Sequence, residues 1–315
     1  MVNVLSVILF VLGFVLILKG ASFLVNSAVS LAQKAKVPTI VVGATVVAIA
    51  TTFPETTVSL VSSFNGMEAV GVSTAVGSMI CNFTIVLGVA FLFLPSKIEP
   101  ESFLSKALYF CLCVIALFIF GIDGKVGKLE SIILLLLLAF FVILNCIEAL
   151  KDDTPRELNR VEDSWFKIIT EFIISALCIG LGAIVLVNNV DNISSLLGLE
   201  NSIVSFVVIA VGTNIPELVT TLTSIKMKNP EIGVGNIFGA SIIDCTLLIA
   251  CSSFASVSGA IYISKAMLLL TIPALFLITA LISLPIIKNG RSNRLQGFLL
   301  LLLYMVYTFL IIKFA

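Results

Sequence analysis

Ten long apolar runs account for nearly the whole 315-residue chain and restrict it to a membrane environment. They cover residues 3–32, 38–64, 69–94, 103–122, 129–150, 165–189, 202–225, 232–256, 260–287 and 295–314. A helix of about 20 apolar residues crosses the hydrocarbon core of a bilayer. With 59% hydrophobic residues, 11% charged residues and no histidine, the chain lacks the charged surface of a soluble globular protein. We therefore expect an all-α membrane protein with ten transmembrane helices.

Basic residues are distributed unequally between the two sides of this predicted bundle. The connections that follow odd-numbered spans hold 13 of the 18 Lys and Arg residues, and the largest share lies in the connection that begins at Lys151. Because basic residues concentrate in cytoplasmic loops, we expect this central loop to be cytoplasmic and both termini to lie outside the cell membrane. The charged connection divides the chain into a first five-helix unit (1–150), a linker (151–163) and a second five-helix unit (164–315).

The two halves align with each other without a gap at a constant offset of 162 residues. Three pairs of segments carry the match, namely 20–26 with 182–188, 48–55 with 210–217, and 77–82 with 239–244. Self-similarity of this kind indicates a duplicated structural unit. Since each unit has five spans, the second must enter the membrane from the opposite side. This gives two inverted-topology five-helix repeats, an architecture found in many secondary transporters.

Each repeat places a proline and a glutamate near the middle of a long apolar run. Pro54 and Glu55 lie in the second run, and Pro216 and Glu217 lie in the seventh. An ionised side chain at the bilayer centre costs about 2.5–3.5 kcal/mol on insertion scales, and proline removes a backbone donor and breaks the helix. A single copy is equally consistent with a kinked helix whose carboxylate is satisfied by packing. Two copies at the same offset favour a functional site.

A helix that is broken at membrane depth frees backbone carbonyls, which then line a buried or wet cavity. The carbonyls expected to be free belong to Ala48, Thr51, Ala210 and Thr213. Carbonyl, hydroxyl and carboxylate oxygens are the ligands that hard cations such as Ca²⁺ prefer. Asn82 and Asp244 follow the glutamates of their repeats by 27 residues, and Ser78 shares a helical face with Asn82. The predicted ion site comprises Glu55, Glu217, Thr51, Thr213, Asn82, Asp244 and Ser78.

Two other charged residues inside predicted spans, Lys19 and Glu171, have no charged counterpart in the other repeat. A structural ion pair, or snorkelling toward the membrane surface, accounts for them more readily than a role in transport. The seven cysteines lack histidine partners and the spacing of metal ligands, so we expect small apolar core residues. No prosthetic group is expected.

Through its motifs the chain resembles the sodium/calcium exchanger family of the cation/calcium antiporter superfamily. The motifs are Ala-Thr-Thr-Phe-Pro-Glu at 50–55, Gly-Thr-Asn-Ile-Pro-Glu at 212–217, Gly-Ser-Met-Ile-Cys-Asn at 77–82 and Gly-Asn-Ile-Phe-Gly-Ala-Ser-Ile-Ile-Asp at 235–244. The resemblance implies secondary antiport of Na⁺ and Ca²⁺ by alternating access, with both ions competing for Glu55 and Glu217 at the membrane midplane. It implies further ligands at Ala48, Thr51, Thr52, Ser78, Ala210, Thr213 and Asn214.

The chain departs from the family pattern at three positions. Ala50 replaces the usual glycine, and Asn214 and Ala240 each replace a usual serine. Because Ala240 removes a hydroxyl ligand, the counter-ion and its stoichiometry stay open, and a calcium/proton antiporter that uses the same carboxylates is the alternative function. Against this alternative, the pair Asn82 and Asp244 resembles the sodium branch of the superfamily, whereas the proton branch favours glutamate on those helices.

Two functions from other classes are less favoured. A cation channel is one, but the chain carries its own two-fold repeat and needs no oligomeric ring to form a pore. An intramembrane protease is another, but the sequence has no histidine and no catalytic motif. The expected partners are Ca²⁺ with Na⁺ or H⁺, together with the lipid bilayer. We expect no enzymatic activity, no nucleic-acid binding and no obligatory protein partner.

Overall fold

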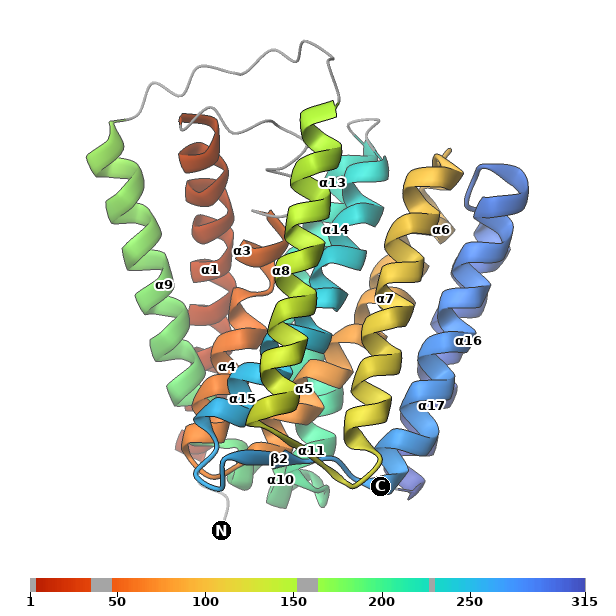
Figure 1. The fold of residues 1–315 in the computed structure, drawn as a ribbon. Helices are drawn as coiled ribbons and strands as arrows, with labels where there is room; N and C mark the ends of the chain where they lie inside the picture. The colour runs from red at the N-terminus through yellow and green to blue at the C-terminus, as the bar shows by residue number, and fades with distance from the viewer. Residues whose placement is uncertain (1–3, 35–46, 152–163, 227–229, 315) are drawn as a thin grey trace.

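The computed structural model describes residues 4–34, 47–151, 164–226 and 230–314. Its long helices lie side by side along one axis (Figure 1). Eight helices in the described part are long and apolar enough to cross a membrane, and the bent pair Ser205–Thr213 and Ile215–Lys226 counts as a ninth if it is one span. The second predicted span, 38–64, begins outside the described residues, and the predicted linker 151–163 lies outside them except for Lys151.

The first half contains α1 (Val4–Lys34), α3 (Ala48–Thr51), α4 (Phe53–Phe64), α5 (Glu68–Cys81), the π-helical segment η2 (Asn82–Val86), α6 (Leu87–Phe93), α7 (Pro100–Gly121) and α8 (Lys128–Lys151). The second half contains α9 (Trp165–Val187), α10 (Val190–Leu197), α11 (Asn201–Val204), the π-helical segment η3 (Ser205–Ile209), α12 (Ala210–Thr213), α13 (Ile215–Lys226), α14 (Pro230–Ile243), the π-helical segment η4 (Asp244–Leu248), α15 (Ile249–Ala255), α16 (Lys265–Asn289) and α17 (Arg294–Phe314). The start of α1 and the end of α17 lie at the same end of the bundle (Figure 1), as an even number of crossings requires.

The repeat predicted from the sequence is visible in the helix boundaries. The elements α3, α4, α5, η2 and α6 begin and end 162 residues before α12, α13, α14, η4 and α15, respectively. The break between α3 and α4 therefore has its counterpart between α12 and α13. The switch from α-helix to π-helix also occurs at equivalent positions, so the gapless match in sequence corresponds to a gapless match in local structure.

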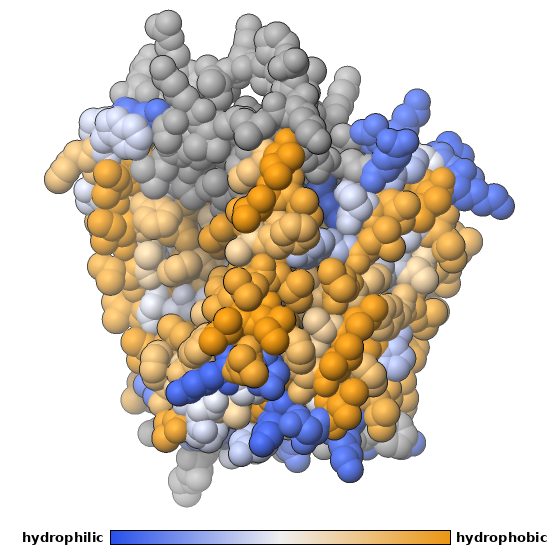
Figure 2. Space-filling model, in the orientation of Figure 1, coloured by the Kyte–Doolittle hydropathy of each residue, from blue (hydrophilic) through white to orange (hydrophobic). Residues whose placement is uncertain are grey.

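The outer surface of the bundle is apolar, as a lipid-facing surface must be. Figure 2 shows a belt of hydrophobic side chains across the middle of one face, with hydrophilic residues gathered toward its two ends. Large exposed side chains on three of the long helices include Leu136, Leu269 and Phe309. An exposed apolar surface of this extent is incompatible with a soluble monomer. The expectation of an all-α membrane protein is confirmed.

The apolar core lies between the two repeats and fixes the helices that carry the candidate ligands. The ring of Phe83, on η2, packs edge-to-face on Phe110 of α7 at 4.7 Å and on Phe238 of α14 at 4.9 Å, both measured between ring centroids. All three rings are fully buried. Edge-to-face aromatic pairs add directional contacts to the burial of area, so η2 and α14 are held against each other next to the positions of Asn82 and Asp244.

Short stretches of extended backbone join the loops at the two ends of the bundle. The strands β1 (Lys125–Gly127) and β2 (Ala260–Tyr262) pair antiparallel, with Val126 opposite Ile261. An isolated bridge joins Lys97 to Arg291. The predicted span 260–287 is therefore wrong at its start, because residues 260–262 form a strand and α16 begins only at Lys265. A hydropathy pattern does not distinguish a short apolar strand from the end of an apolar helix.

Helices α1 and α9 pack closely through glycine. A Cβ atom on Gly13 would lie 2.8 Å from the carbonyl oxygen of Gly182, and a Cβ on Gly182 would lie 2.8 Å from that of Gly13. Further along, a Cβ on Gly20 would lie 2.7 Å from a side-chain carbon of Ile179. Small residues let two membrane helices approach to backbone contact. The two helices lie beside the broken helices α3 and α4 (Figure 1).

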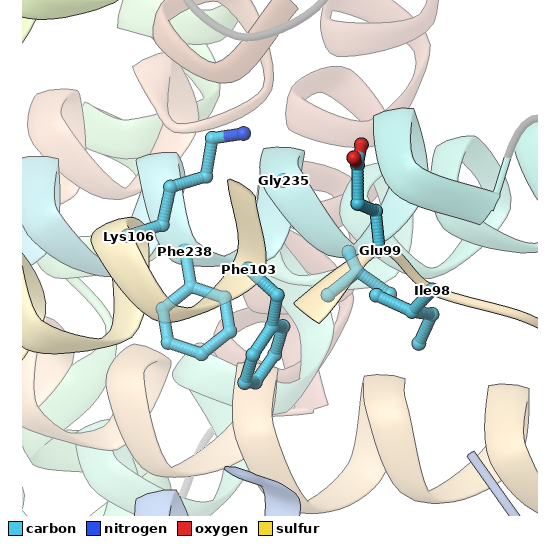
Figure 3. Close-up of a pocket in the computed structure, with 7 residues that line it drawn as sticks. Ile98, Glu99, Phe103, Lys106, Gly235 and Phe238 are labelled. Carbon is cyan, nitrogen blue, oxygen red and sulfur yellow. The ribbon is translucent and has the colours of Figure 1, made fainter. Parts of the chain in front are cut away.

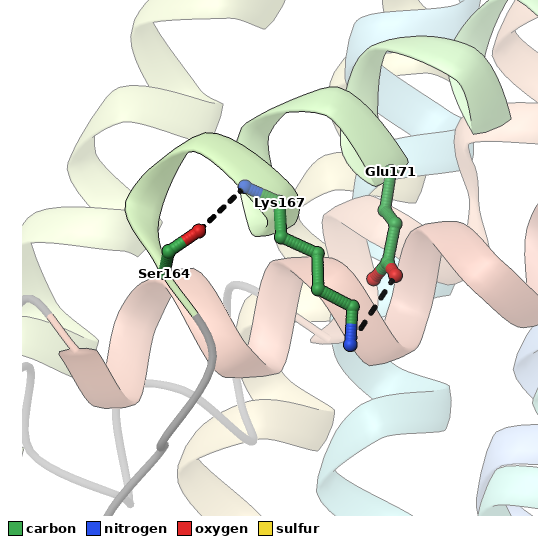
Figure 4. A network of polar contacts seen from close by, with 3 residues as sticks. All are labelled: Ser164, Lys167 and Glu171. Carbon is green, nitrogen blue, oxygen red and sulfur yellow. Dashed lines mark hydrogen bonds and ion pairs between the residues drawn. The ribbon is translucent and has the colours of Figure 1, made fainter.

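Of the two charged residues that have no counterpart in the other repeat, Glu171 forms an ion pair. Lys167 forms an ion pair with Glu171 at 4.0 Å within α9, and the hydroxyl of Ser164 accepts a hydrogen bond from the backbone N–H of Lys167 (Figure 4). Both charged side chains are about half exposed. Lys19 is exposed on α1. The interpretation of Glu171 as a member of a structural ion pair is confirmed, with Lys167 as the partner.

Candidate ion-binding site

The two proline-glutamate motifs interrupt their helices as predicted. Helix α3 ends at Thr51 and α4 begins at Phe53, and the break in the second repeat bends the chain by 43°. Pro54 lies in the first turn of α4, where a missing N–H costs no helical hydrogen bond. Glu55 and Glu217 both lie in the first turn of the helix that follows the break. The positive end of each helix dipole therefore points at a carboxylate, which favours negative charge at these positions.

Glu55 and Glu217 are enclosed by protein, and most of their carboxylate oxygens lack a hydrogen-bond partner in the described structure. Their exposed fractions are 0% and 1%. Both carboxylate oxygens of Glu55 and Oε2 of Glu217 have no hydrogen-bond partner among the described residues. The two carboxylates repel each other, and Asp244 adds to the repulsion at Glu55. A buried charge without a partner costs several kcal/mol, so this arrangement is favourable only when a cation or a proton occupies it.

The repeats are interleaved at the two glutamates. The side chain of Thr213, from the second repeat, lies beside the Glu55 carboxylate, and that of Thr51, from the first repeat, lies beside Glu217. Both threonines are fully buried. Each half of the chain thus contributes to the surroundings of the other half's carboxylate, which makes the two glutamates a single site.

A second group of polar side chains joins α5, η2, η4 and the break before α13. The hydroxyl of Ser78 donates to Oδ2 of Asp244 at 2.7 Å, and Nδ2 of Asn82 lies 3.4 Å from the same oxygen. The amide Nδ2 of Asn214 lies 3.1 Å from the Ser78 hydroxyl. Within the described structure, Oδ1 of Asn82 and Oδ1 of Asp244 have no hydrogen-bond partner. The structure therefore brings the four residues together and leaves two oxygen atoms uncommitted.

The carbonyls of Ala48 and Ala210 are not free in this conformation, contrary to expectation. The Ala48 carbonyl accepts from the Thr52 hydroxyl at 2.6 Å and from the Thr51 hydroxyl at 3.2 Å. The Ala210 carbonyl accepts from Nδ2 of Asn214 at 2.6 Å. Hydroxyl and amide side chains that follow a carbonyl by three or four residues compete for it locally. The residues predicted as ligands are present, but the side chains of Thr52 and Asn214 occupy the two carbonyls.

The switch to π-helix was not anticipated from the sequence. Asn82 is the first residue of η2 and Asp244 the first of η4. Single π-helical turns inside α-helices are frequent at functional sites because they displace side chains from the regular helical positions. In both segments a threonine donates its hydroxyl to a carbonyl four residues earlier, Thr84 to Ile80 and Thr246 to Ile242. The two threonines are matched at the 162 offset, but the same hydrogen bond occurs in the α-helices at Thr74 and Thr279, so it does not by itself mark a π-helical turn.

The chemistry of the site depends on several kinds of oxygen together. In the described residues, no three carboxylate or cysteine side chains are close enough to hold a metal ion by themselves. The site instead combines carboxylate, amide and hydroxyl oxygens at the breaks and at the π-helical segments. Hard cations accept such mixed oxygen sets, with backbone carbonyls and water completing the shell.

A separate small pocket lies between α7 and α14 and contains none of these residues. Figure 3 shows the rings of Phe103 and Phe238 along it, with the side chains of Glu99 and Lys106 beyond them. Ile98, Val234 and Gly235 complete the lining. This pocket is too apolar at its base to hold an ion, and the candidate site remains the cluster around the two glutamates.

Comparison with known proteins agrees with this description. The sequence pattern of the sodium/calcium exchanger protein family matches residues 5–147 and 167–313. The sodium/calcium exchanger MaX1 of Methanosarcina acetivorans is 25% identical over 345 residues, which cover 95% of this chain and 96% of that protein. The putative antiporter CaxA of Alkalimonas amylolytica is 24% identical over 319 residues, covering 97% and 98%. A solved structure of the sodium-calcium exchanger NCX_Mj, soaked with Na⁺ and Sr²⁺, superposes with a TM-score of 0.69 at 26% identity and covers 97% of this chain and 98% of that chain.

Proposed function

This chain belongs to the sodium/calcium exchanger protein family, and on that premise we propose that it exchanges Na⁺ for Ca²⁺ by alternating access. As a member of this family it is a multi-pass membrane transporter and a cation antiporter, not an enzyme. The specific proposal is that Ca²⁺ and Na⁺ compete for one site at the membrane midplane. The observation that carries it is the pair of fully buried carboxylates, Glu55 and Glu217, three of whose four oxygens have no hydrogen-bond partner among the described residues.

Competition follows from the electrostatics of the pair. Two carboxylates that repel each other cannot both stay ionised in a buried site without cations. The site is therefore empty only at a high free-energy cost, and one ion leaves readily only when another enters. This property couples the two fluxes, because the protein changes conformation with its carboxylates neutralised.

We assign calcium to the central part of the site and sodium to a wider set of positions. Ca²⁺ is bound by the carboxylates of Glu55 and Glu217 with the carbonyls of Thr51 and Thr213. The positions assigned to Na⁺ share these glutamates and add Ala48, Thr51, Thr52, Ser78, Ala210, Thr213 and Asn214, with Asn82 and Asp244 completing the polar cluster. Because Thr52 and Asn214 donate to the carbonyls of Ala48 and Ala210 through both their side chains and their backbone N–H groups, these donors must move before those carbonyls are free to bind an ion.

We propose that α1 and α9 move together across the broken helices to change access. The glycine contacts between them are close enough to make the pair one body. The excess of basic residues on one side orients the chain with both ends outside and the central connection cytoplasmic. In this orientation Na⁺ that enters from outside displaces Ca²⁺ bound from the cytoplasmic side. The five-helix units 1–150 and 164–315, with the linker 151–163, are the proposed inverted repeats.

The test is uptake of radioactive calcium into liposomes that contain the purified protein. Uptake driven by an outward Na⁺ gradient, and absent without one, is the expected result. Uptake driven only by a pH gradient would establish the calcium/proton alternative, which the replacement of family serines by Asn214 and Ala240 makes worth testing. Passive Ca²⁺ flux without any counter-ion would refute both and indicate a channel. Glu171→Gln, at a structural ion pair on α9, is the matched acidic control and should transport normally.

A further inference from the structure

Helix α4 carries a line of buried polar side chains that continues beyond Glu55. Ser59, Ser62 and Ser63 follow Glu55 by four, seven and eight residues, which places all four on one helical face. The three serines are fully buried. The helix runs from the midplane toward the end of the bundle where α1 begins and α17 ends (Figure 1). Hydroxyl groups therefore lie between the candidate ion site and that end of the molecule.

Helices α5 and α15 add oxygen atoms to this line. The Ser59 hydroxyl donates to the carbonyl of Gly71 at 2.8 Å and lies 2.9 Å from the hydroxyl of Ser252. A Cβ atom on Gly71 would lie 2.9 Å from Oγ of Ser63 and 3.0 Å from Oγ of Ser252. Oxygens from three helices thus converge at Gly71. We call Ser59, Ser63, Ser252 and the Gly71 carbonyl the hydroxyl cluster.

One member of the hydroxyl cluster has no hydrogen-bond partner. Oγ of Ser63 is buried, points toward Gly71 and lacks a partner among the residues that the structure describes. A buried hydroxyl that makes no hydrogen bond is destabilising by about 1–3 kcal/mol. Alanine at position 63 would avoid that cost, so packing alone gives no reason for a serine here.

The line of polar groups reaches a carboxylate near the surface. The hydroxyl of Ser256, four residues after Ser252 and just beyond α15, donates to Oε1 of Glu68 at 2.9 Å. Glu68 is the first residue of α5 and is half-buried. From Glu68 through Ser256 and Ser252 to Ser59, oxygen atoms lead from the edge of the protein to the helix that carries Glu55.

The other repeat shows that the fold does not require these oxygens. At the 162 offset, Ile225 is equivalent to Ser63, Ala90 to Ser252, Leu94 to Ser256 and Pro230 to Glu68. The equivalent helices α13, α14 and α6 begin and end at equivalent residues, yet they pack through apolar side chains. The hydroxyls of Ser59 and Ser62 have counterparts in Thr221, which contacts the carbonyl of Gly233 at 3.5 Å, and in Ser224, which donates to the carbonyl of Thr220. Those of Ser63, Ser252 and Ser256 have none. The hydroxyl groups of Ser63, Ser252 and Ser256 therefore occur at only one of the two equivalent places in the repeated fold.

From this asymmetry we propose that the hydroxyl cluster is a transit site for small hard cations that move between Glu68 at the surface and Glu55. The proposal rests on the proposed function, since it assigns the path to the same ion site. Glu68 attracts the cation, and the neutral oxygens of the cluster replace its water molecules one by one. Because the cluster has no carboxylate, the cation is bound weakly and passes on to Glu55. In the conformation described here the Ser59 hydroxyl is hydrogen-bonded to Ser252 and to the Gly71 carbonyl, so passage requires α4 to separate from α15.

The first test removes two hydroxyls from the transit site without touching the ion site. The double variant Ser63→Ala with Ser252→Ala should fold, because it deletes one unsatisfied hydroxyl and copies Ala90 of the other repeat. We expect the initial rate of Ca²⁺ uptake in proteoliposomes to fall at least about fivefold, while the equilibrium dissociation constant for Ca²⁺, measured by calorimetry in detergent, stays within about twofold of the wild type. Ser194→Ala is the control, since Ser194 is also a buried hydroxyl without a partner in the described structure but lies on α10.

Two results would overturn the transit site. One is a double variant whose uptake rate matches that of the wild type and of Ser194→Ala. The other is a loss of Ca²⁺ affinity in proportion to the loss of rate, which would make the serines structural supports of the ion site.

The second test does not depend on transport. The variant Ser63→Cys introduces a thiol into the cluster. Trimethylammonium-ethyl methanethiosulfonate, which is a cation, should modify this thiol faster than the anionic sulfonate analogue does. The reaction of the seven native cysteines, measured in the wild type, is subtracted. Ile225→Cys, the equivalent position in the other repeat, should stay unmodified. Absence of added reaction in Ser63→Cys would refute the path. The two proposals can fail separately. If the wild-type protein shows no Na⁺-driven Ca²⁺ uptake, the proposed function fails. If the thiol of Ser63→Cys is nevertheless modified by the cationic reagent and not by the anionic one, the transit site stands.

Discussion

Replacing Glu55 by glutamine separates binding from stability, because the two should change in opposite directions. The structure places both carboxylate oxygens of Glu55 in full burial without partners in the described residues, under repulsion from Glu217 and Asp244. An unpaired buried charge costs about 3–5 kcal/mol, whereas an unpaired amide costs about 1–3 kcal/mol. At a pH high enough to ionise Glu55, Glu55→Gln should therefore be about 2 kcal/mol more stable than the wild type in the absence of metal ions.

The effect on Ca²⁺ binding should be larger and of the opposite sign. Two unit charges about 4 Å apart interact by about 4 kcal/mol at an effective dielectric constant of about 20, and a divalent ion doubles this gross attraction. Dehydration of the ion and the remaining amide oxygen offset part of it. A net loss of about 4 kcal/mol corresponds to a roughly 10³-fold weaker dissociation constant. The loss for Na⁺ should be about half as large in free energy, since it carries one charge.

Thermal unfolding in detergent, with and without Ca²⁺, measures both effects. At a concentration of about 100 times its dissociation constant, Ca²⁺ should stabilise the wild type by about 2.7 kcal/mol and the variant by less than about 0.1 kcal/mol. The melting temperature of Glu55→Gln without ions should be higher than that of the wild type. Glu171→Gln should behave as the wild type in both conditions. A Glu55→Gln protein that is less stable without ions, or that keeps the full shift with Ca²⁺, would contradict the reasoning.

Three further variants test individual contacts. Ser78→Ala removes a hydroxyl that donates at 2.7 Å to the Asp244 carboxylate, at a position assigned to Na⁺. A hydrogen bond to a charged group contributes about 1.5–3 kcal/mol, so calorimetry should show Na⁺ binding at least about tenfold weaker, and unchanged Na⁺ binding would remove Ser78 from the sodium positions. Asn214→Ser restores the family hydroxyl and removes the Nδ2 donor from the Ala210 carbonyl, so Ca²⁺ uptake should depend more steeply on Na⁺. An unaltered Na⁺ titration would contradict the assigned ligand role. Gly212→Ala places a methyl group 2.1 Å from a ring carbon of Phe14. Overpacking of this kind costs about 1–3 kcal/mol, so the melting temperature should drop. In the control Gly180→Ala the new methyl group has no atom within 4 Å, and the melting temperature should stay unchanged or rise.

The sequence was sufficient for the parts of this protein that the membrane itself dictates. A helix must be apolar over about 20 residues to cross the bilayer, so the spans are visible in composition alone. A carboxylate at mid-span is costly enough to be rare, which made Glu55 and Glu217 conspicuous. The gapless 162-residue offset then identified the two repeats, and the helix boundaries of the structure recur at the same offset.

Other features depend on contacts between segments that are far apart in the chain. The hydrogen bond from Thr52 to the Ala48 carbonyl depends on the backbone angles at the break. A proline in the sequence predicts a break but does not determine these angles. Residues 260–262 form a strand because residues 125–127 pair with them. The hydropathy pattern, which contains no information on this pairing, predicts a helix there.

The amino-acid order alone therefore specifies the depth of each residue in the membrane and its counterpart in the other repeat. It does not specify which side chains meet, because helical periodicity gives a residue's face but not the helix that the face contacts. Ser63 and Ser252 are 189 positions apart in the chain, and each alone is an ordinary hydroxyl in an apolar helix. Their convergence on Gly71 arises from the packing of α4, α5 and α15, and it turns separate hydroxyls into a group of oxygens that can bind a cation.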